Sequence, residues 1–237
     1  MNGPALPALI SVLERARSIG FLGPGPVEDH VEHARRFVRA LDAVGIGAGV
    51  DVLDGGGVDG RADEGADPAL DTDDGGAAWS VADIGAGGGV PGLVLLVERP
   101  GLRMVLIDAA QKRCAFLVWA LAELELSDRA EVWCGRAEEL GHEERARERF
   151  DAVVARGFGP PSITLECATG LVRPGGYIVI SEPPQRRRWP SDGLAELALE
   201  VAPPTDGMAL FRRRPGLAAR YPRPARQQQR RPTFDVE

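Results

Sequence analysis

The sequence predicts an α/β fold in which helices cover both faces of a mostly parallel β-sheet. Between residues 79 and 181, short apolar runs rich in β-branched residues alternate with segments of helical apolar spacing. This alternation is typical of doubly wound parallel sheets. The first run, Trp79–Ile84, ends abruptly in glycines, as a buried strand does where it meets a ligand-binding loop. We therefore expect a site at the carboxyl ends of the strands.

The composition limits the class of protein. A chain of 237 residues can bury a sizeable core, no apolar run approaches the length of a membrane span, and the N-terminus lacks the pattern of a signal peptide. Cys114, Cys134 and Cys167 stand in apolar patterns without metal-ligand spacing, so we expect buried free thiols. We expect a cytoplasmic monomer with no bound metal and no membrane contact.

The net charge of -7 is unevenly spread along the chain. Residues 51–74 hold nine acids and one arginine, whereas residues 212–231 hold eight arginines and no acid. We expect residues 46–78 to be an insert without secondary structure, because they offer little to bury. Residues 215–237 are expected to form a basic tail that can meet phosphate.

Two amphipathic helices are expected before the sheet, at residues 5–19 and 27–44. They are separated by the turn cluster GFLGPGP. We expect residues 1–45 to form a helical cap on the sheet. His30 and His33 lie three apart on the second helix, a spacing that permits metal binding. Without further ligands nearby, a solvated or hydrogen-bonded role is the preferred interpretation.

The remaining elements belong to a domain at residues 79–214. LALEVAP and GMALFRRR are expected to close the sheet as antiparallel strands, and the helix after the second strand is expected to turn Cys114, Leu117, Val118, Leu121 and Leu124 inward. The turn signal RPGG is expected to end a helix. Further strands are expected at residues 103–108, 130–134, 150–155 and 177–181, and helices at 110–126, 142–149 and 162–172.

The glycine-rich loop after the first strand fits two cofactors. Gly87, Gly89 and Gly92 spell the dinucleotide fingerprint G-x-G-x-x-G, with Asp108 at the distance of a ribose-binding acid. Read from Asp83, the loop gives D-x-G-x-G-x-G, the pattern of S-adenosylmethionine (SAM) sites. A carboxylate there repels a pyrophosphate but suits a cationic methionine group, so SAM is favoured. The expected SAM-binding residues of this loop are Asp83, Gly85, Ala86, Gly87, Gly89, Pro91 and Gly92.

Three further strand ends supply candidate site residues. Asp108, with Ala109, is expected to bind the ribose of SAM; the alternative is an acid that caps the following helix. Ala137 and Glu138 follow the third strand and are expected to meet adenine. Arg156 follows the fourth, where the methyl acceptor approaches, and is the candidate catalytic residue. An arginine at a buried strand end favours an anion, either substrate phosphate or the SAM carboxylate, over a structural ion pair.

Two features absent from the strand ends limit the type of methyl acceptor. The Asn/Asp-Pro-Pro-aromatic element common in enzymes that methylate exocyclic amines is replaced by ARGFGPP. No His or Tyr stands at a strand end as a general base. Such a site suits an acceptor whose lone pair is already free, for example a ring nitrogen such as guanine N7, where catalysis is mostly positioning.

Several segments, in order, resemble one family. DIGAGGGVPG, LIDAAQKRCAFL, GRAEEL, FDAVVARGF, LVRPGGYIVI and the basic end AARYPRPARQQQRRPTF are similar to the guanine-N7 methyltransferases of small-subunit ribosomal RNA (the RsmG or GidB family), as is HVEHARRFVRAL near the N-terminus. The resemblance implies the seven-stranded class I SAM-methyltransferase fold, SAM as cofactor and ribosomal RNA as partner. It implies that Lys112 and Arg113 border cofactor and RNA, that Arg156 faces the substrate, and that Arg220 and Arg223 belong to an RNA-binding end.

Departures from the family leave other acceptors open. GFLGPGP stands in place of an Asn-Leu-Thr element, Ser181-Glu182-Pro183-Pro184 in place of Lys-Gly, and the acidic insert has no counterpart. The alternatives are a methyltransferase for a small molecule or a protein, and a non-catalytic RNA-binding module. Within the basic tail, Tyr221 and Phe234 are expected to stack on unpaired bases. Deleting residues 215–237 is expected to leave SAM affinity nearly unchanged.

Overall fold

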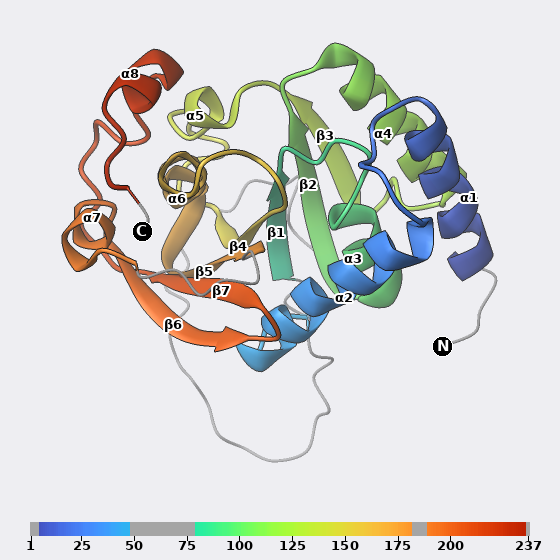
Figure 1. Ribbon diagram of the computed structural model, residues 1–237, viewed down its shortest axis with the longest axis horizontal. Coiled ribbons are helices and arrows are strands. Elements are labelled where there is room, and N and C mark those ends of the chain that lie inside the picture. Colours follow the sequence, from blue (N-terminus) through green and yellow to red (C-terminus); the bar gives the residue numbers. More distant parts are fainter. Residues whose placement is uncertain (1–4, 48–78, 182–188, 236–237) are drawn as a thin grey trace.

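The computed structural model describes residues 5–47, 79–181 and 189–235. In these parts a central β-sheet carries helices on both faces (Figure 1). It has seven strands in the order β3-β2-β1-β4-β5-β7-β6. The pairs between β3 and β5 in this order are parallel, and β7 runs antiparallel to β5 and β6. The expected doubly wound, mostly parallel sheet with antiparallel closing strands is confirmed.

The elements follow the expected order closely. The strands are β1 Trp79–Ile84, β2 Leu102–Asp108, β3 Ala130–Cys134, β4 Phe150–Ala155, β5 Val172–Ser181, β6 Leu199–Thr205 and β7 Met208–Arg213. The helices are α1 Ala5–Ser18, α2 Val27–Ala43, α3 Gly92–Glu98, α4 Gln111–Glu123, α5 Ala137–Leu140, α6 Pro161–Leu171, α7 Ser191–Glu196 and α8 Ala225–Arg230.

The strand order reverses at β1. The chain runs outward from β1 through β2 to β3 and then returns to the other side of β1 as β4. Ile84 at the end of β1 is in register with Ile107 on one side and Ala155 on the other. The loops after β1, β2 and β4 therefore leave the sheet together, at the switch point where open α/β sheets bind ligands.

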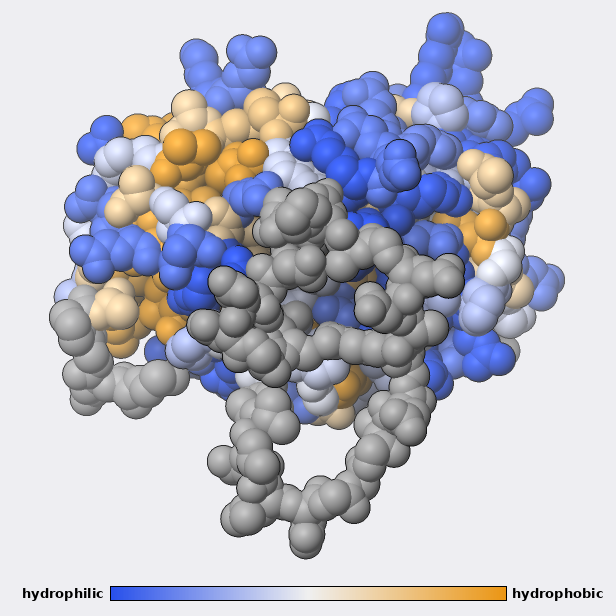
Figure 2. All heavy atoms as spheres, turned by 180° about the vertical axis from the view of Figure 1, so that it is seen from behind, coloured by the Kyte–Doolittle hydropathy of each residue, from blue (hydrophilic) through white to orange (hydrophobic). Residues whose placement is uncertain are grey.

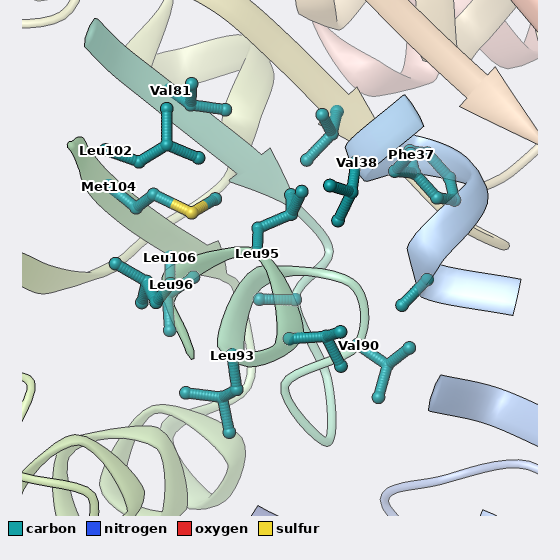
Figure 3. Close-up of a cluster of buried hydrophobic side chains, with 14 of the residues drawn as sticks. Phe37, Val38, Val81, Val90, Leu93, Leu95, Leu96, Leu102, Met104 and Leu106 are labelled. Atoms are coloured by element: carbon teal, nitrogen blue, oxygen red, sulfur yellow. The ribbon is translucent and has the colours of Figure 1, made fainter. Parts of the chain in front are cut away.

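The core lies in two layers, one on each face of the sheet. Alternate strand residues serve the two layers because side chains of a strand alternate in direction. Met104 and Leu106 of β2 belong to the same layer as Leu95 of α3 and Phe37 of α2 (Figure 3). Val105, between them, joins the opposite layer, which lies under α6 and the C-terminal residues. Burial on both faces explains the near-continuous apolar runs of the parallel strands.

Four expectations about secondary structure and burial are wrong. Residues 142–149 form turns and no helix, because the segment has no apolar stripe that could hold a helix against the core. RPGG lies inside β5 and does not separate a helix from a strand. Val118 of α4 is 57% exposed, whereas Phe116 is buried. Cys114 and Cys167 are buried free thiols as expected, but Cys134 is exposed.

The C-terminal residues pack against the rest of the protein, whereas the sequence predicted a basic tail whose aromatic residues are free to stack on bases. Residues 225–230 form α8. Tyr221 and Phe234 are buried in the layer under α6 and α7, so they are not free to stack on bases. The prediction rested on the arginines of this segment. Its apolar residues Tyr221 and Phe234 anchor the segment to the core.

Parts of the expected organisation lie outside the described residues. Residues 48–78 contain nearly all of the predicted insert, and residues 182–188 contain Glu182-Pro183-Pro184. No helix in the described ranges is long and apolar enough to cross a membrane. Among the described residues, the exposed large hydrophobic side chains are those of Ile19, Val118 and Val201. Figure 2 shows hydrophilic residues around smaller hydrophobic areas on one face of the molecule.

Candidate cofactor site at the strand switch point

The loop after β1 is built from glycines that no other residue could replace without strain. Gly85, Gly87 and Gly89 have φ values of +70°, +55° and +90°. Residues with a Cβ rarely adopt these positive φ values. The backbone N–H groups of Gly85 and Ala86 donate to the carbonyl of Ile107 at 2.8 and 3.0 Å. These bonds hold the loop against the end of β2, beside Asp108.

Gly92 lets α3 begin directly over Asp83. Its backbone N–H donates to Asp83 Oδ2 at 2.9 Å, and a Cβ at this position would lie 2.8 Å from that oxygen. Pro91 precedes the helix as its N-cap residue. The short helix therefore directs a backbone N–H at the carboxylate, which favours negative charge there.

Asp83 is buried and only half satisfied. Its Oδ1 atom has no hydrogen-bond partner among the described residues. The pKa of Asp83 is raised from 3.8 to about 7, mainly because the carboxyl is buried; the Gly92 N–H and Arg156 lower this pKa, and the nearby Asp108 contributes to raising it. Buried carboxylate oxygens normally have partners, so the free oxygen fits the ammonium group of a methionine moiety.

Asp108 lies at the end of the neighbouring strand with its carboxylate already oriented. Oδ2 accepts the Gly87 N–H at 3.0 Å, and Oδ1 accepts the Ala110 N–H at 2.8 Å. Arg113 Nη1 is 3.7 Å from Oδ2. A carboxylate has about four acceptor positions, so two remain for ribose hydroxyls. The contact with Ala110 orients the turn before α4, whose N-terminus has no side-chain cap, and it is compatible with ribose binding.

A cavity of about 270 Å³ opens beside Asp108. Glu138 is 6% exposed, and its Oε1 accepts a hydrogen bond from Arg136 Nε at 2.5 Å. The cavity connects the ends of β1, β2 and β3 with the loop after β4, α6 and α8. Its lining residues are Gly85, Ile107, Asp108, Ala109, Gly135, Arg136, Ala137, Glu138, Phe158, Gly159, Pro160, Ile163, Cys167, Ala225, Gln228 and Gln229.

Arg156 extends from the end of β4 toward α2, away from this cavity. Its Nη2 lies 2.5 Å from His30 Nδ1, and His30 Nε2 lies 3.1 Å from the carbonyl of Gly23. A neutral imidazole satisfies both contacts if Nε2 carries the proton and Nδ1 accepts from the guanidinium. Burial lowers the pKa of Arg156, and Asp83 raises it. The hydrogen-bonded role expected for His30 is confirmed.

The other histidine of α2, His33, has one ring nitrogen without a partner in the described part of the chain. His33 Nε2 makes no hydrogen bond within the described residues, and its ring packs edge-on against Phe37. Burial lowers its pKa, and Arg156, Arg36 and His30 lower it further. No group of three or more metal-ligating side chains occurs in the ranges that the structure describes.

The four residues expected to bind substrate divide into two pairs. Lys112 and Arg113 are exposed on the first turn of α4, beside Asp108. Arg220 is exposed and pairs with Glu196 at 3.2 Å. The side chain of Arg223 is 11% exposed and pairs with Glu166 at 2.6 Å, so this charge already has a partner inside the protein.

Sequence reasoning missed two contributions to the site. The turn between α1 and α2 packs on the cofactor loop, since a Cβ on Gly88 would lie 2.7 Å from the carbonyl oxygen of Phe21. Helix α8 supplies Ala225, Gln228 and Gln229 to the cavity wall. The aromatic residues Tyr221 and Phe234 could have indicated that the C-terminal segment packs on the core. Their spacing in the sequence does not show which element they pack against.

The sheet order, the antiparallel β7 and the acid-terminated glycine loop define a class I SAM-dependent methyltransferase fold. Residues 69–185 match the family model GidB, described as rRNA small subunit methyltransferase G. The match covers just under half of the chain, and this segment is similar to the GidB family.

Curated relatives carry the name "Ribosomal RNA small subunit methyltransferase G". The protein from Moorella thermoacetica is 40% identical over 107 residues, 45% of this chain and 44% of that protein. The one from Lactobacillus acidophilus is 36% identical over 122 residues, 52% of this chain and 50% of that protein. The chain thus spans about half the length of the curated relatives it matches. A solved O-methyltransferase family protein from Burkholderia thailandensis is 17% identical, with a TM-score of 0.42, over 59% of this chain and 52% of that chain.

Proposed function

We propose that the protein transfers the methyl group of SAM to guanine N7 of small-subunit ribosomal RNA. The observation that carries the proposal is the pair of buried carboxylates, Asp83 and Asp108, at adjacent strand ends, one with a free oxygen and one with spare acceptor positions. They lie within the segment that is similar to the GidB family. The names of the curated relatives support ribosomal RNA as the acceptor.

Each end of the cofactor has a proposed partner. Asp83 accepts a hydrogen bond from the ammonium group, Asp108 accepts from the ribose hydroxyls, and Ala137 and Glu138 border adenine. When bound, SAM supplies a methyl group on a positively charged sulfur. The proposed cofactor-binding residues are Asp83, Gly85, Ala86, Gly87, Gly89, Pro91, Gly92, Asp108, Ala109, Ala137, Glu138 and Arg156.

Arg156 is the proposed catalytic residue, and His30 positions it. Its guanidinium is close enough to Asp83 to affect the pKa of that residue, so it can bind the cofactor carboxylate or a substrate phosphate beside the methyl group. The N7 lone pair of guanine needs no deprotonation. The task of the site is therefore to align that lone pair with the methyl group and the sulfur.

Exposed cations on two sides of the site are proposed to bind the RNA backbone. Lys112 and Arg113 flank the cofactor site on α4, and Arg220 lies on the C-terminal residues. Arg226 and Arg230 are exposed on α8 and form no ion pair with another described residue. Each phosphate neutralised steepens the log-log salt dependence of binding by about 0.7 to 0.9.

The domain division follows from these roles. Residues 1–45 form the helical cap and residues 79–214 the SAM-binding domain. Residues 46–78 are an insert, and residues 215–237 are a basic end of the chain. Each boundary remains a proposal.

Mapping N7-methylguanosine in ribosomal RNA tests the proposed acceptor. Cells that lack the gene should lose one such methyl group. The wild-type gene should restore it and the Asp108→Ala variant should not. An unchanged methylation pattern in the deletion strain would favour a small-molecule or protein acceptor. Restoration by Asp108→Ala at full level would contradict the proposed cofactor contact.

A further inference from the structure

The C-terminal segment, Gly216–Phe234, is fixed to α6 by a buried carboxylate. Glu166 is 1% exposed. Its Oε1 accepts from the Arg223 backbone N–H and from Nε, both at 2.8 Å, and its Oε2 accepts from Arg223 Nη2 at 2.6 Å and from Thr233 Oγ1 at 2.8 Å. A buried carboxylate with four donors is fully satisfied. Glu166 therefore sets the position of the residues that lead into and out of α8.

A second anchor lies one residue earlier. Pro222 packs so closely on two glycines that a Cβ on Gly141 or Gly170 would approach its ring to 2.8 or 2.5 Å. The carbonyl of Pro222 lies 2.6 Å from His142 Nε2. The segment is thus held by the close packing of Pro222 as well as by the ion pair and hydrogen bonds of Glu166. The turn around residue 142, expected from the sequence to be a surface helix, contributes to this anchor.

These anchors place α8 over the cavity. Ala225, Gln228 and Gln229 line it together with Gly135–Glu138 after β3 and with Ile163 and Cys167 of α6, and α8 lies near α5 and α6 in Figure 1. Gln228 is buried, and its Nε2 donates to the carbonyl of Arg223 at 2.5 Å. Gln229 is exposed and lines the cavity, and its side chain makes no hydrogen bond to the described part of the chain.

We propose that α8 forms the adenine-side wall of the cofactor site and that Gln229 is the residue that selects adenine. The inference rests on the proposed use of SAM, whose adenine is assigned to the residues after β3 that face α8 across the cavity. A glutamine amide offers a donor and an acceptor side by side, which pairs with the amino group and a ring nitrogen of adenine. The free amide of Gln229 is the side chain available for this contact.

Removal of the C-terminal residues should lower the affinity for SAM. Cutting residues 215–237 removes one wall of the cavity, so SAM affinity falls, whereas the sequence alone led to the expectation of little change. A deletion also removes the buried Tyr221 and Phe234. A point substitution at the cavity is therefore the cleaner test.

Titration calorimetry with two ligands and two variants tests the proposal. The ligands are S-adenosylhomocysteine and S-inosylhomocysteine, which carries an oxygen in place of the adenine amino group. Gln229→Ala should weaken S-adenosylhomocysteine binding by about three- to tenfold, the loss of a neutral hydrogen bond, and should reduce the preference over S-inosylhomocysteine. Gln227→Ala, an exposed position of the same helix outside the cavity lining, should leave both affinities within about twofold.

The outcomes separate the two proposals. Unchanged affinity in Gln229→Ala, or an equal loss for both ligands, would overturn the role of Gln229 while the use of SAM stands. Failure of the wild-type protein to bind S-adenosylhomocysteine would overturn the proposed function, and the inference with it. Thermal unfolding of each variant confirms that it is folded.

Discussion

Asp83→Asn should stabilise the free protein and weaken cofactor binding. Burial raises the pKa of Asp83 from 3.8 to about 7. Between these values the unfolded chain releases the proton and the folded chain retains it, so wild-type stability falls as the pH rises from about 4 to about 7. The difference of about three pH units, at about 1.4 kcal/mol for each, amounts to about 4 kcal/mol at pH 8.

Asparagine keeps the shape of the side chain and an acceptor for the Gly92 N–H without the buried charge. Urea unfolding at pH 5 and pH 8 measures the effect. Asp83→Asn should raise the free energy of unfolding at pH 8 by several kcal/mol, and the variant should lose the part of the pH dependence due to this group. Its affinity for S-adenosylhomocysteine should fall, because the ammonium group loses a charged partner worth about 1.5 to 3 kcal/mol.

Asp151 provides the matched control, since it is also a buried aspartate of the parallel sheet. Its carboxylate is fully partnered, by Arg173 Nε at 2.8 Å and by the Ser80 N–H at 2.8 Å. Asp151→Asn should therefore destabilise the protein at pH 8. A loss of stability in Asp83→Asn at pH 8, similar to that in Asp151→Asn, would refute the reasoning that Asp83 is an unpaired buried acid kept for a ligand.

Three further predictions concern the same site. Asp108→Ala should weaken S-adenosylhomocysteine binding by about 1.5 to 3 kcal/mol in titration calorimetry; an unchanged affinity would leave only a role in holding the backbone at Gly87 and Ala110. Gly88→Ala should lower the free energy of unfolding by about 1 to 3 kcal/mol, because its Cβ meets the carbonyl of the α1–α2 turn at 2.7 Å, whereas Gly101→Ala, with nothing within 4 Å, should not. His30→Ala should lower the methyl-transfer rate less than Arg156→Ala does; equal rates in wild type and His30→Ala would argue against the positioning role.

The sequence was sufficient for the parallel strands and their ends. Trp79–Ile84 and Phe150–Ala155 were placed residue for residue, because largely buried strands between turn residues have a strong local pattern. The positions of Asp83 and Asp108 followed from the same pattern, since carboxyl ends of parallel strands share one edge. The glycine loop was informative because its spacing is fixed by backbone conformation.

The sequence did not predict contacts between distant segments. The buried pair of Glu166 and Arg223 joins residues 57 positions apart, and nothing local marks Glu166 as different from an exposed helix residue. His30 and Arg156 are 126 positions apart. Such pairs depend on the packed arrangement of the whole sheet. The C-terminal residues were therefore interpreted by their charge, and the wall that they form was missed.

The transfer of a labelled methyl group to purified small-subunit ribosomal RNA tests the central claim most directly. The protein is incubated with SAM labelled in the methyl group and with RNA from cells that lack the gene, and the digested nucleosides are separated. The account predicts label in N7-methylguanosine, with Asp108→Ala strongly impaired at low SAM. Binding of S-adenosylhomocysteine without any label in the RNA would contradict the proposed acceptor, and label in a different nucleoside would contradict transfer to guanine N7.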